Sequence, residues 1–344
     1  MIDRARTAIV IDPRYQSHAT GHGHPERPER IGVLLPMVES LAADFTRLEA
    51  RLASGQELAM VHDGAYVSTV EATQHRTQFA FDADTPTSPE SYDTACLAAG
   101  GVLSLLDEIM RGGVDNGFAF VRPPGHHAER HRAMGFCLFN NVAVGAEYLR
   151  RRYGLGRILV VDWDLHHGNG TQHLFEAEPE VLYVSLHQFP YYPGSGAIDE
   201  VGRHDGEGYT VNLPFPAGCG DAEYGDAFRR IVEPIAHDYR PEFVLVSAGF
   251  DAHGRDPLGG MRVSESGFRS MTRSLMKVAA ASAGGRCAAV LEGGYDLTAM
   301  TASARQVLSE LRGDSDPLTD PQEPTRIAPL IEQIARQQRR YWRL

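Results

Sequence analysis

The stretch VVDWDLHHGNGTQ, from Val160 to Gln172, decides how the rest of this chain is interpreted. It begins with β-branched residues, which are typical of a strand, and then changes abruptly into acidic residues, histidines and glycines. Because side chains alternate along a strand, Asp162, Asp164 and His166 would leave one face together. Zinc binds carboxylate oxygen and imidazole nitrogen, and a catalytic zinc has three protein ligands and one open position. The stretch therefore indicates a strand end that can hold a metal, with Asp164 and His166 as two of the ligands.

An acidic strand end followed by glycine is also typical of a solvated turn, so this motif alone does not establish a metal site. Three other strand-like runs, however, end in equally unusual residues. They are Gly117–Val121 (GFAFV), Phe243–Ser247 (FVLVS) and Cys287–Leu291 (CAAVL). The side chains that follow these runs are His126, His127, Asp251 and Tyr295. We expect all of them to meet the first motif at one rim of a sheet.

The order of the strand-like and helix-like segments predicts the fold class. Strands alternate with helices, and each strand is a nearly continuous apolar run, which favours an α/β fold with a mostly parallel sheet flanked by helices on both faces. In such sheets the ligand site lies beyond the carboxyl ends of the strands. We expect one domain over residues 1–313. A linker-like run, GDSDPLTDPQEPT, and a helix docked on the domain make up residues 314–344. The apolar positions of this helix are Ile327, Leu330, Ile331 and Ile334.

The composition is that of a soluble globular enzyme, with 42% hydrophobic and 23% charged residues. A net charge of -12 gives no general reason to bind nucleic acid or an anionic membrane, and it fits a cationic partner better. The four cysteines are widely spaced without a CxxC pair, which favours reduced thiols in the cytoplasm. The start of the chain lacks the apolar core of a signal peptide, and no apolar run is long enough to span a membrane. We therefore expect a cytoplasmic protein.

Five segments in register carry a resemblance to a known family. RPPGHHAE, GFCLFNNVA, VDWDLHHGNGTQ, SAGFDAHGRDPLGG and LEGGYD resemble, in this order, the deacetylase core of class II histone deacetylases and their bacterial relatives, the histone deacetylase-like and acetylpolyamine amidohydrolases. The resemblance covers roughly Pro25 to Gly313. It implies an arginase-like α/β fold and zinc-dependent hydrolysis of an acetylated amine.

The resemblance assigns roles to individual residues. It implies that Asp164, His166 and Asp251 bind one zinc ion, and that the hydroxyl of Tyr295 stabilises the oxyanion. The physical reading agrees, because zinc polarises a carbonyl and acidifies water. Gly293 and Gly294, which precede Tyr295, allow the backbone to approach the substrate.

The same resemblance makes His126 and His127 a general acid/base pair. Two adjacent histidines can differ only through their partners, and Asp162 would hold His126 as a charged pair. Asn169 would orient His127, and an amide raises the pKa of its histidine less than a carboxylate would. We therefore expect His127 to act as the base and His126 as its electrostatic partner.

A substrate channel and two structural potassium ions are also implied. Phe136 and Tyr192 match the aromatic pair that walls the family's acyl-lysine channel, although Phe is usual at the second position. The other residues assigned to the channel are Gly135, Leu258, Gly294 and Arg30, whose guanidinium can bind a product carboxylate. The first potassium site comprises Asp162, Asp164, His166, Ser185 and Leu186. The second comprises Phe175, Glu178, Val181 and Tyr209.

Leu258 bears on substrate choice, because polyamine-selective relatives carry an acidic residue at this position. An apolar Leu would not attract the second ammonium of an acetylpolyamine. The expected function is therefore removal of acetyl or other acyl groups from lysine side chains or related amides. An acetylpolyamine deacetylase is the alternative, and a non-catalytic acetyl-ligand-binding regulatory protein is disfavoured because no site residue is missing. Expected partners are an acylated lysine or an acetylated small amine, and a homo-oligomer stays open.

Overall fold

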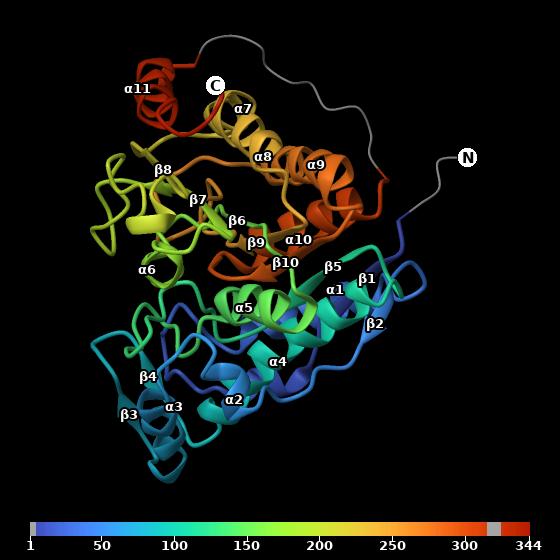
Figure 1. Cartoon of the computed structure of the whole chain (residues 1–344). Coiled ribbons are helices and arrows are strands. Elements are labelled where there is room, and N and C mark those ends of the chain that lie inside the picture. Colours follow the sequence, from blue (N-terminus) through green and yellow to red (C-terminus); the bar gives the residue numbers. More distant parts are fainter. Residues whose placement is uncertain (1–4, 315–324) are drawn as a thin grey trace.

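An eight-stranded sheet runs through the centre of the computed structural model, which describes residues 5–314 and 325–344 (Figure 1). Its strand order is β2-β1-β5-β10-β9-β6-β7-β8, and every pairing in it is parallel. The prediction of an α/β fold with a mostly parallel sheet is thus confirmed. The strands are β1 (Thr7–Ile11), β2 (Thr46–Leu48), β5 (Asn116–Phe120), β6 (Ile158–Asp162), β7 (Val181–Gln188), β8 (Thr210–Phe215), β9 (Phe243–Ala248) and β10 (Cys287–Leu291).

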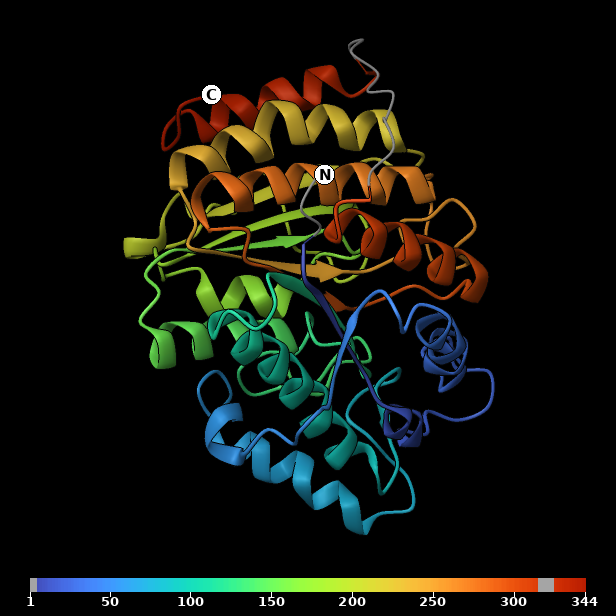
Figure 2. The same cartoon turned by 90° about the vertical axis from the view of Figure 1, so that its right-hand side faces the viewer.

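Helices cover both faces of the sheet, as expected (Figures 1 and 2). One layer contains α4 (Ser91–Met110), α5 (Asn141–Tyr153) and α6 (Asn169–Phe175). The other contains α1 (Glu29–Glu39), α10 (Leu297–Leu311), α9 (Glu265–Ser282), α7 (Asp221–Ala227), α8 (Glu233–Tyr239) and α11 (Ala328–Gln338). A π-helical segment, Phe228–Val232, joins α7 to α8 and inserts a wider turn between them.

The smaller elements were not predicted, because they are too short to show a hydrophobic period. They are the helices α2 (Gly55–Leu58) and α3 (Gly64–Glu71), the antiparallel pair β3 (Phe79–Ala80) and β4 (Pro86–Thr87), and 3₁₀ turns at Pro13–Ser17, Ala72–His75 and His204–Gly206.

Local sequence explains most element boundaries. Seven strands are buried along their whole length because helices cover both sheet faces, which accounts for their largely apolar runs. The Asn140 side chain caps α5 by accepting from the amide of Ala143, and Ser264 caps α9 in the same way. Ser88 resembles a helix cap in the sequence, but α4 begins only at Ser91. The hydroxyl of Ser88 instead accepts from the amide of Ala19.

The C-terminal helix α11 packs on the π-helical segment and on the edge strand β8 (Figure 2). Ile331 and Ile334 are buried, and the indole of Trp342 donates to the carbonyl of Gly208. Most of the linker-like run, residues 315–324, lies outside the described residues, and the division of the chain at residue 313 stays a prediction. Among the described residues, no helix is long and apolar enough to cross a membrane.

The sheet order places the candidate residues. β5, β10, β9 and β6 are four consecutive neighbours in its middle, and all of them point the same way. These are the strands that the sequence motifs follow. Their carboxyl ends therefore bring four separate loops to one edge of the sheet.

Candidate active site

Three buried side chains converge where β6 and β9 end. Asp164 and His166 follow β6, and Asp251 follows β9. The Nδ1 atom of His166 lies 3.0 Å from Oδ2 of Asp251 and 3.2 Å from Oδ1 of Asp164. One ligand atom from each of the three residues lies within 4.8 Å of the other two. This donor set, two carboxylates and one imidazole, is compatible with a divalent metal ion.

The electrostatics of the cluster favour a cation. Burial and the charge of Asp164 raise the pKa of Asp251 to about 7, because two carboxylates cannot both ionise at low cost in a dry site. Burial lowers the pKa of His166, but its hydrogen bonds to the two aspartates outweigh burial and raise the pKa to about 9. The pocket therefore already attracts a positive charge, and a metal ion can supply it.

Backbone groups hold the two carboxylates in place. The amide of Leu165 donates to Oδ1 of Asp251 at 2.8 Å, and the amide of Gly293 donates to Oδ2 of Asp164 at 2.8 Å. A Cβ atom at Gly293 would lie 2.3 Å from Oδ2 of Asp251, so any other residue would displace this carboxylate. The glycine pair predicted a close approach of the backbone to the substrate, and in the structure the backbone at Gly293 closely approaches Asp164 and Asp251.

His126 and His127 follow β5, and their ring centroids are 4.0 Å apart. Nδ1 of His126 lies 3.1 Å from Oδ2 of Asp162, and Nδ1 of His127 lies 2.8 Å from Oδ1 of Asn169. Burial lowers the pKa of His126, but the nearby aspartates outweigh burial and raise it to about 10. Burial and the neighbouring His126 lower the pKa of His127 well below its ordinary value. The two imidazoles therefore differ in charge.

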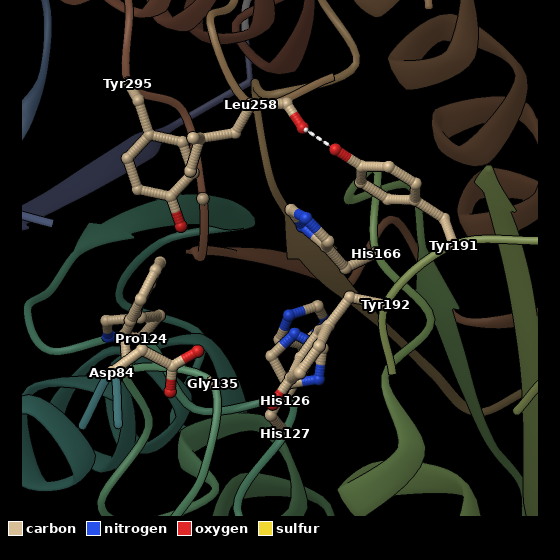
Figure 3. Close-up of a pocket in the computed structure, with 12 residues that line it drawn as sticks. Asp84, Pro124, His126, His127, Gly135, His166, Tyr191, Tyr192, Leu258 and Tyr295 are labelled. Atoms are coloured by element: carbon tan, nitrogen blue, oxygen red, sulfur yellow. Dashed lines mark hydrogen bonds between the residues drawn. The ribbon is translucent and has the colours of Figure 1, made fainter. Parts of the chain in front are cut away.

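A pocket of about 250 Å³ opens above these groups (Figure 3). Phe136 and Tyr192 form aromatic walls, and the Tyr192 ring packs edge-on against His127 with centroids 5.2 Å apart. The Tyr295 hydroxyl points into the pocket, and its ring lies edge-on to Phe136 at 5.9 Å. Phe136 has a φ of 68°, a conformation that costs a non-glycine residue about 1 kcal/mol or more. The pocket is thus bounded by aromatic rings and has the paired histidines and His166 among its lining residues.

The sequence did not single out Tyr191, which crosses the mouth of this pocket. Its hydroxyl donates to the carbonyl oxygen of Leu258 at 2.8 Å (Figure 3). Its ring stacks on His166 with centroids 5.7 Å apart and an interplanar angle of 27°. This bond ties the loop after β7 to the loop after β9 above a metal-ligand candidate. No local signal distinguishes Tyr191 from its neighbour Tyr192.

Two acidic residues that the sequence did not assign hold the site from behind. Asp256 accepts from the amides of Tyr295 at 2.7 Å and Leu258 at 2.9 Å, so one carboxylate anchors both loops. Glu292 accepts from the amide of Gly125 at 2.6 Å and fixes the turn that precedes the paired histidines. Both lie inside quoted motifs, but a motif does not show which backbone groups a side chain meets.

Asp84 lines the pocket at its rim, although the sequence indicates only a turn residue there. It lies between β3 and β4, which the sequence did not predict. Burial and the neighbouring Asp82 raise the pKa of Asp84. Asp84 therefore places an acidic side chain at the rim of the pocket.

The prediction that Arg30 and Gly294 belong to the substrate channel differs from the structure, because neither lies among the residues that line the pocket. Arg30 is fully buried, and its guanidinium donates to the carbonyl oxygens of Gly294 and Glu292 and to the Glu26 carboxylate. It lies behind Tyr295, 5.2 Å from the ring centre. Arg30 makes three hydrogen bonds within the protein and is fully buried outside the pocket lining, so it does not make the expected contact with a product carboxylate in this pocket.

Gly135 does line the pocket, with a φ of +57°. A Cβ atom there would lie 2.4 Å from Cδ2 of His127. The position therefore requires glycine for two independent reasons, conformation and space.

The residues assigned to potassium form two groups. Asp162 of β6 is in register with Ser185 of β7, next to Leu186 and the metal-ligand candidates. The second group encloses the turn from α6 into β7, where the amide of Glu178 donates to the carbonyl of Phe175 at 2.9 Å. Val181 begins β7, and the Tyr209 carbonyl accepts from Tyr183. The potassium ions themselves stay a prediction.

Comparison with known proteins identifies the class that this fold and site define. The histone deacetylase domain family matches residues 24–311, and the chain belongs to this family. The chain is 43% identical over 320 residues to histone deacetylase 15 of Arabidopsis thaliana, covering 90% of this chain and 57% of that protein. It is 44% identical over 320 residues to the human polyamine deacetylase HDAC10, covering 88% of this chain and 47% of the relative.

A solved structure gives the same result for the fold. The crystal structure of the HDA15 HD domain superposes with a TM-score of 0.91 at 40% identity, covering 98% of this chain and 95% of that one. The chain spans about half the length of the two curated relatives named above.

Proposed function

We propose that this chain is a zinc-dependent amidohydrolase that removes acetyl or other acyl groups from lysine side chains. The observation that supports it best is the buried Asp164–His166–Asp251 cluster beside two histidines of unequal charge, at the base of an aromatic-walled pocket. The similarity to deacetylases supports the same reaction class.

The metal is assigned to Asp164, His166 and Asp251. When bound, zinc supplies a Lewis acid that polarises the amide carbonyl and acidifies water. The remaining chemistry belongs to side chains of the protein.

His127 is the general base. Its Nδ1 faces Oδ1 of Asn169, so Nδ1 carries the proton and Nε2 has a free lone pair. This Nε2 takes a proton from the attacking water and then donates it to the nitrogen of the leaving amine as the carbon–nitrogen bond breaks. General acid–base catalysis of this kind contributes about 10²- to 10⁴-fold. His126 stays protonated beside Asp162 and stabilises the negative charge that develops nearby.

Tyr295 is assigned to the oxyanion. Burial raises the pKa of its phenol well above the ordinary value, so the hydroxyl stays protonated at neutral pH. It can therefore donate a hydrogen bond to the oxygen of the tetrahedral intermediate.

The pocket walls favour a lysine side chain. Phe136 and Tyr192 offer apolar faces to a four-carbon stem, and Leu258 adds a neutral apolar group at the mouth. An acetylpolyamine is the second candidate. It is favoured by Asp84 and Asp82, whose adjacent carboxylates could attract a distal ammonium, and by the similarity to a relative named polyamine deacetylase.

The test compares acetate release from an acetyl-lysine peptide and from N-acetylpolyamines by the purified, zinc-loaded protein, with and without a chelator. We expect the peptide to be the better substrate and chelation to abolish turnover. Faster turnover of an acetylpolyamine would favour the second candidate. Binding of acetyl-lysine without acetate release would overturn the proposed hydrolysis and favour a regulatory binding protein.

Two further assignments accompany this proposal. The two predicted potassium ions would reinforce the loop after β6 and the turn before β7, where carbonyl oxygens are available. We also place the protein in the cytoplasm, because its four cysteines are free and buried rather than paired.

A further inference from the structure

A continuous chain of hydrogen bonds leads from His127 to the protein surface. Nδ1 of His127 is 2.8 Å from Oδ1 of Asn169, and Nδ2 of Asn169 is 2.6 Å from Oε1 of Glu129. The same Glu129 oxygen is 2.8 Å from Nδ1 of His173. The carboxylate of Glu129 is only 10% exposed, whereas the imidazole of His173 is 43% exposed. The described site uses neither Glu129 nor His173.

The contact between His127 and Asn169 does not by itself show which way the Asn169 amide is oriented. An asparagine amide can present either its oxygen or its NH₂ group to an imidazole. The oxygen requires a proton on Nδ1 of His127, which leaves Nε2 free to act as a base. The NH₂ group requires the opposite tautomer, in which Nε2 carries the proton and cannot accept another.

The surroundings of Asn169 select one orientation. Its Nδ2 atom faces three acceptors: the Glu129 carboxylate, the carbonyl of His127 at 3.3 Å and the Met134 sulfur at 3.4 Å. Only the carboxylate is both charged and close, and an ionised carboxylate cannot donate. Rotating the amide by 180° would set Oδ1 against Oε1 of Glu129, two acceptors about 2.6 Å apart.

We propose that Glu129, held by His173, is a positioning residue that fixes the His127 tautomer through Asn169. This inference rests on the proposed function, because the tautomer matters only if His127 is the base. Burial raises the pKa of Glu129, but its hydrogen bonds to His173 and Asn169 outweigh burial and lower it. The carboxylate is therefore ionised at neutral pH and can only accept hydrogen bonds.

The fold allows a clean perturbation. The backbone of Glu129 is held independently of its side chain, since its amide donates to the carbonyl of Arg132 and its carbonyl contacts Nδ1 of His62. Glu129→Leu removes the acceptor at similar size. Glu129→Gln is the matched control, because its amide oxygen can still accept from Asn169. Asn169→Asp supplies a second background, in which no amide needs orienting.

Kinetics on an acetyl-lysine peptide distinguish positioning from simple support of the fold. In the protein that keeps Asn169, we expect Glu129→Leu to lower kcat about tenfold or more with little change in KM. We expect Glu129→Gln to keep most of the parent kcat. In the Asn169→Asp background an aspartate oxygen faces the Glu129 carboxylate at the 2.6 Å contact, so Glu129→Leu removes a repulsion there and we expect kcat not to fall. An equal loss of kcat in both backgrounds overturns the proposal.

The ¹⁵N chemical shifts of His127 provide a readout that needs no turnover. The signals are assigned by their absence in a His127→Gln variant. We expect Nδ1 to be protonated in the parent and the other tautomer to become populated in Glu129→Leu. An unchanged tautomer in Glu129→Leu overturns the inference even if the enzyme is active. A parent protein that releases no acetate, but shows the tautomer change, supports the positioning role while the proposed function fails.

Discussion

Replacing Tyr295 by Phe isolates the hydroxyl assigned to the oxyanion. The ring should keep its place, because it packs on Phe136 at 5.9 Å and below the Arg30 guanidinium at 5.2 Å. Asp256 holds the backbone amide independently of the ring. Loss of one oxyanion donor costs about 2.7–4 kcal/mol, so kcat should fall about 10²- to 10³-fold with KM nearly unchanged.

The assay measures steady-state acetate release from an acetyl-lysine peptide together with urea unfolding of each variant. We expect the free energy of unfolding of Tyr295→Phe to stay within about 0.5 kcal/mol of the parent, since the hydroxyl points into the pocket. Tyr192→Phe is the control, because it removes a hydroxyl from the same pocket without an assigned chemical role. A folded Tyr295→Phe variant that keeps kcat within tenfold of the parent would refute the assignment.

Three further predictions test the metal, the pocket mouth and the buried charges. Asp251→Asn should lower zinc affinity and activity at least about 100-fold, because even residues that only hydrogen-bond to a metal ligand change metal affinity or activity about 10- to 100-fold. A normal metal content, measured by atomic absorption, would contradict this prediction. Tyr191→Phe removes a hydrogen bond worth about 1 kcal/mol to Leu258 at the pocket mouth and should raise KM for an acetyl-lysine peptide by at most about fivefold with little change in kcat, whereas an unchanged KM contradicts this role of the bond. Burial raises the pKa of Glu26, but the charges of Arg122 and Arg30, together with the hydrogen bond from Arg122, outweigh burial and lower it to about 2. Since this folded-state pKa is below the unfolded value of about 4.3, about 3 kcal/mol of stability is present above pH 4.3 and lost as pH falls toward 2. Urea unfolding between pH 5 and pH 2.5 should show this slope, and it should be smaller in Glu26→Gln.

The central sheet was predictable because its signal is local. β5, β9 and β10 are short apolar runs bounded by polar turns, and their predicted limits differ from the structure by no more than one residue. The region from β2 to β4 was not predictable in the same way. Its strands have only two or three residues, too few to show a period; β2 pairs with the distant β1, and β3 and β4 pair only with each other.

The residues of the candidate site likewise differ in how far the local sequence predicts their position. His126, His127, Asp164 and Tyr295 each follow a recognisable strand, so their common edge could be anticipated. Arg30 shows the limit of such reasoning, because nothing in its surroundings along the chain reveals that it binds carbonyl oxygens more than 260 residues away.

The sequence by itself determined the α/β class, the strands and the types of chemical group placed after them, since apolar period and turn composition act over a few residues. The tertiary structure alone decided which groups meet. β5, β10, β9 and β6 are adjacent only after long crossovers. The Glu129–Asn169 contact, the Tyr191–Leu258 bond and the pKa difference between the paired histidines all arise from this packing. Hydrogen bonds and electrostatic fields depend on distances in space, which a linear sequence does not contain.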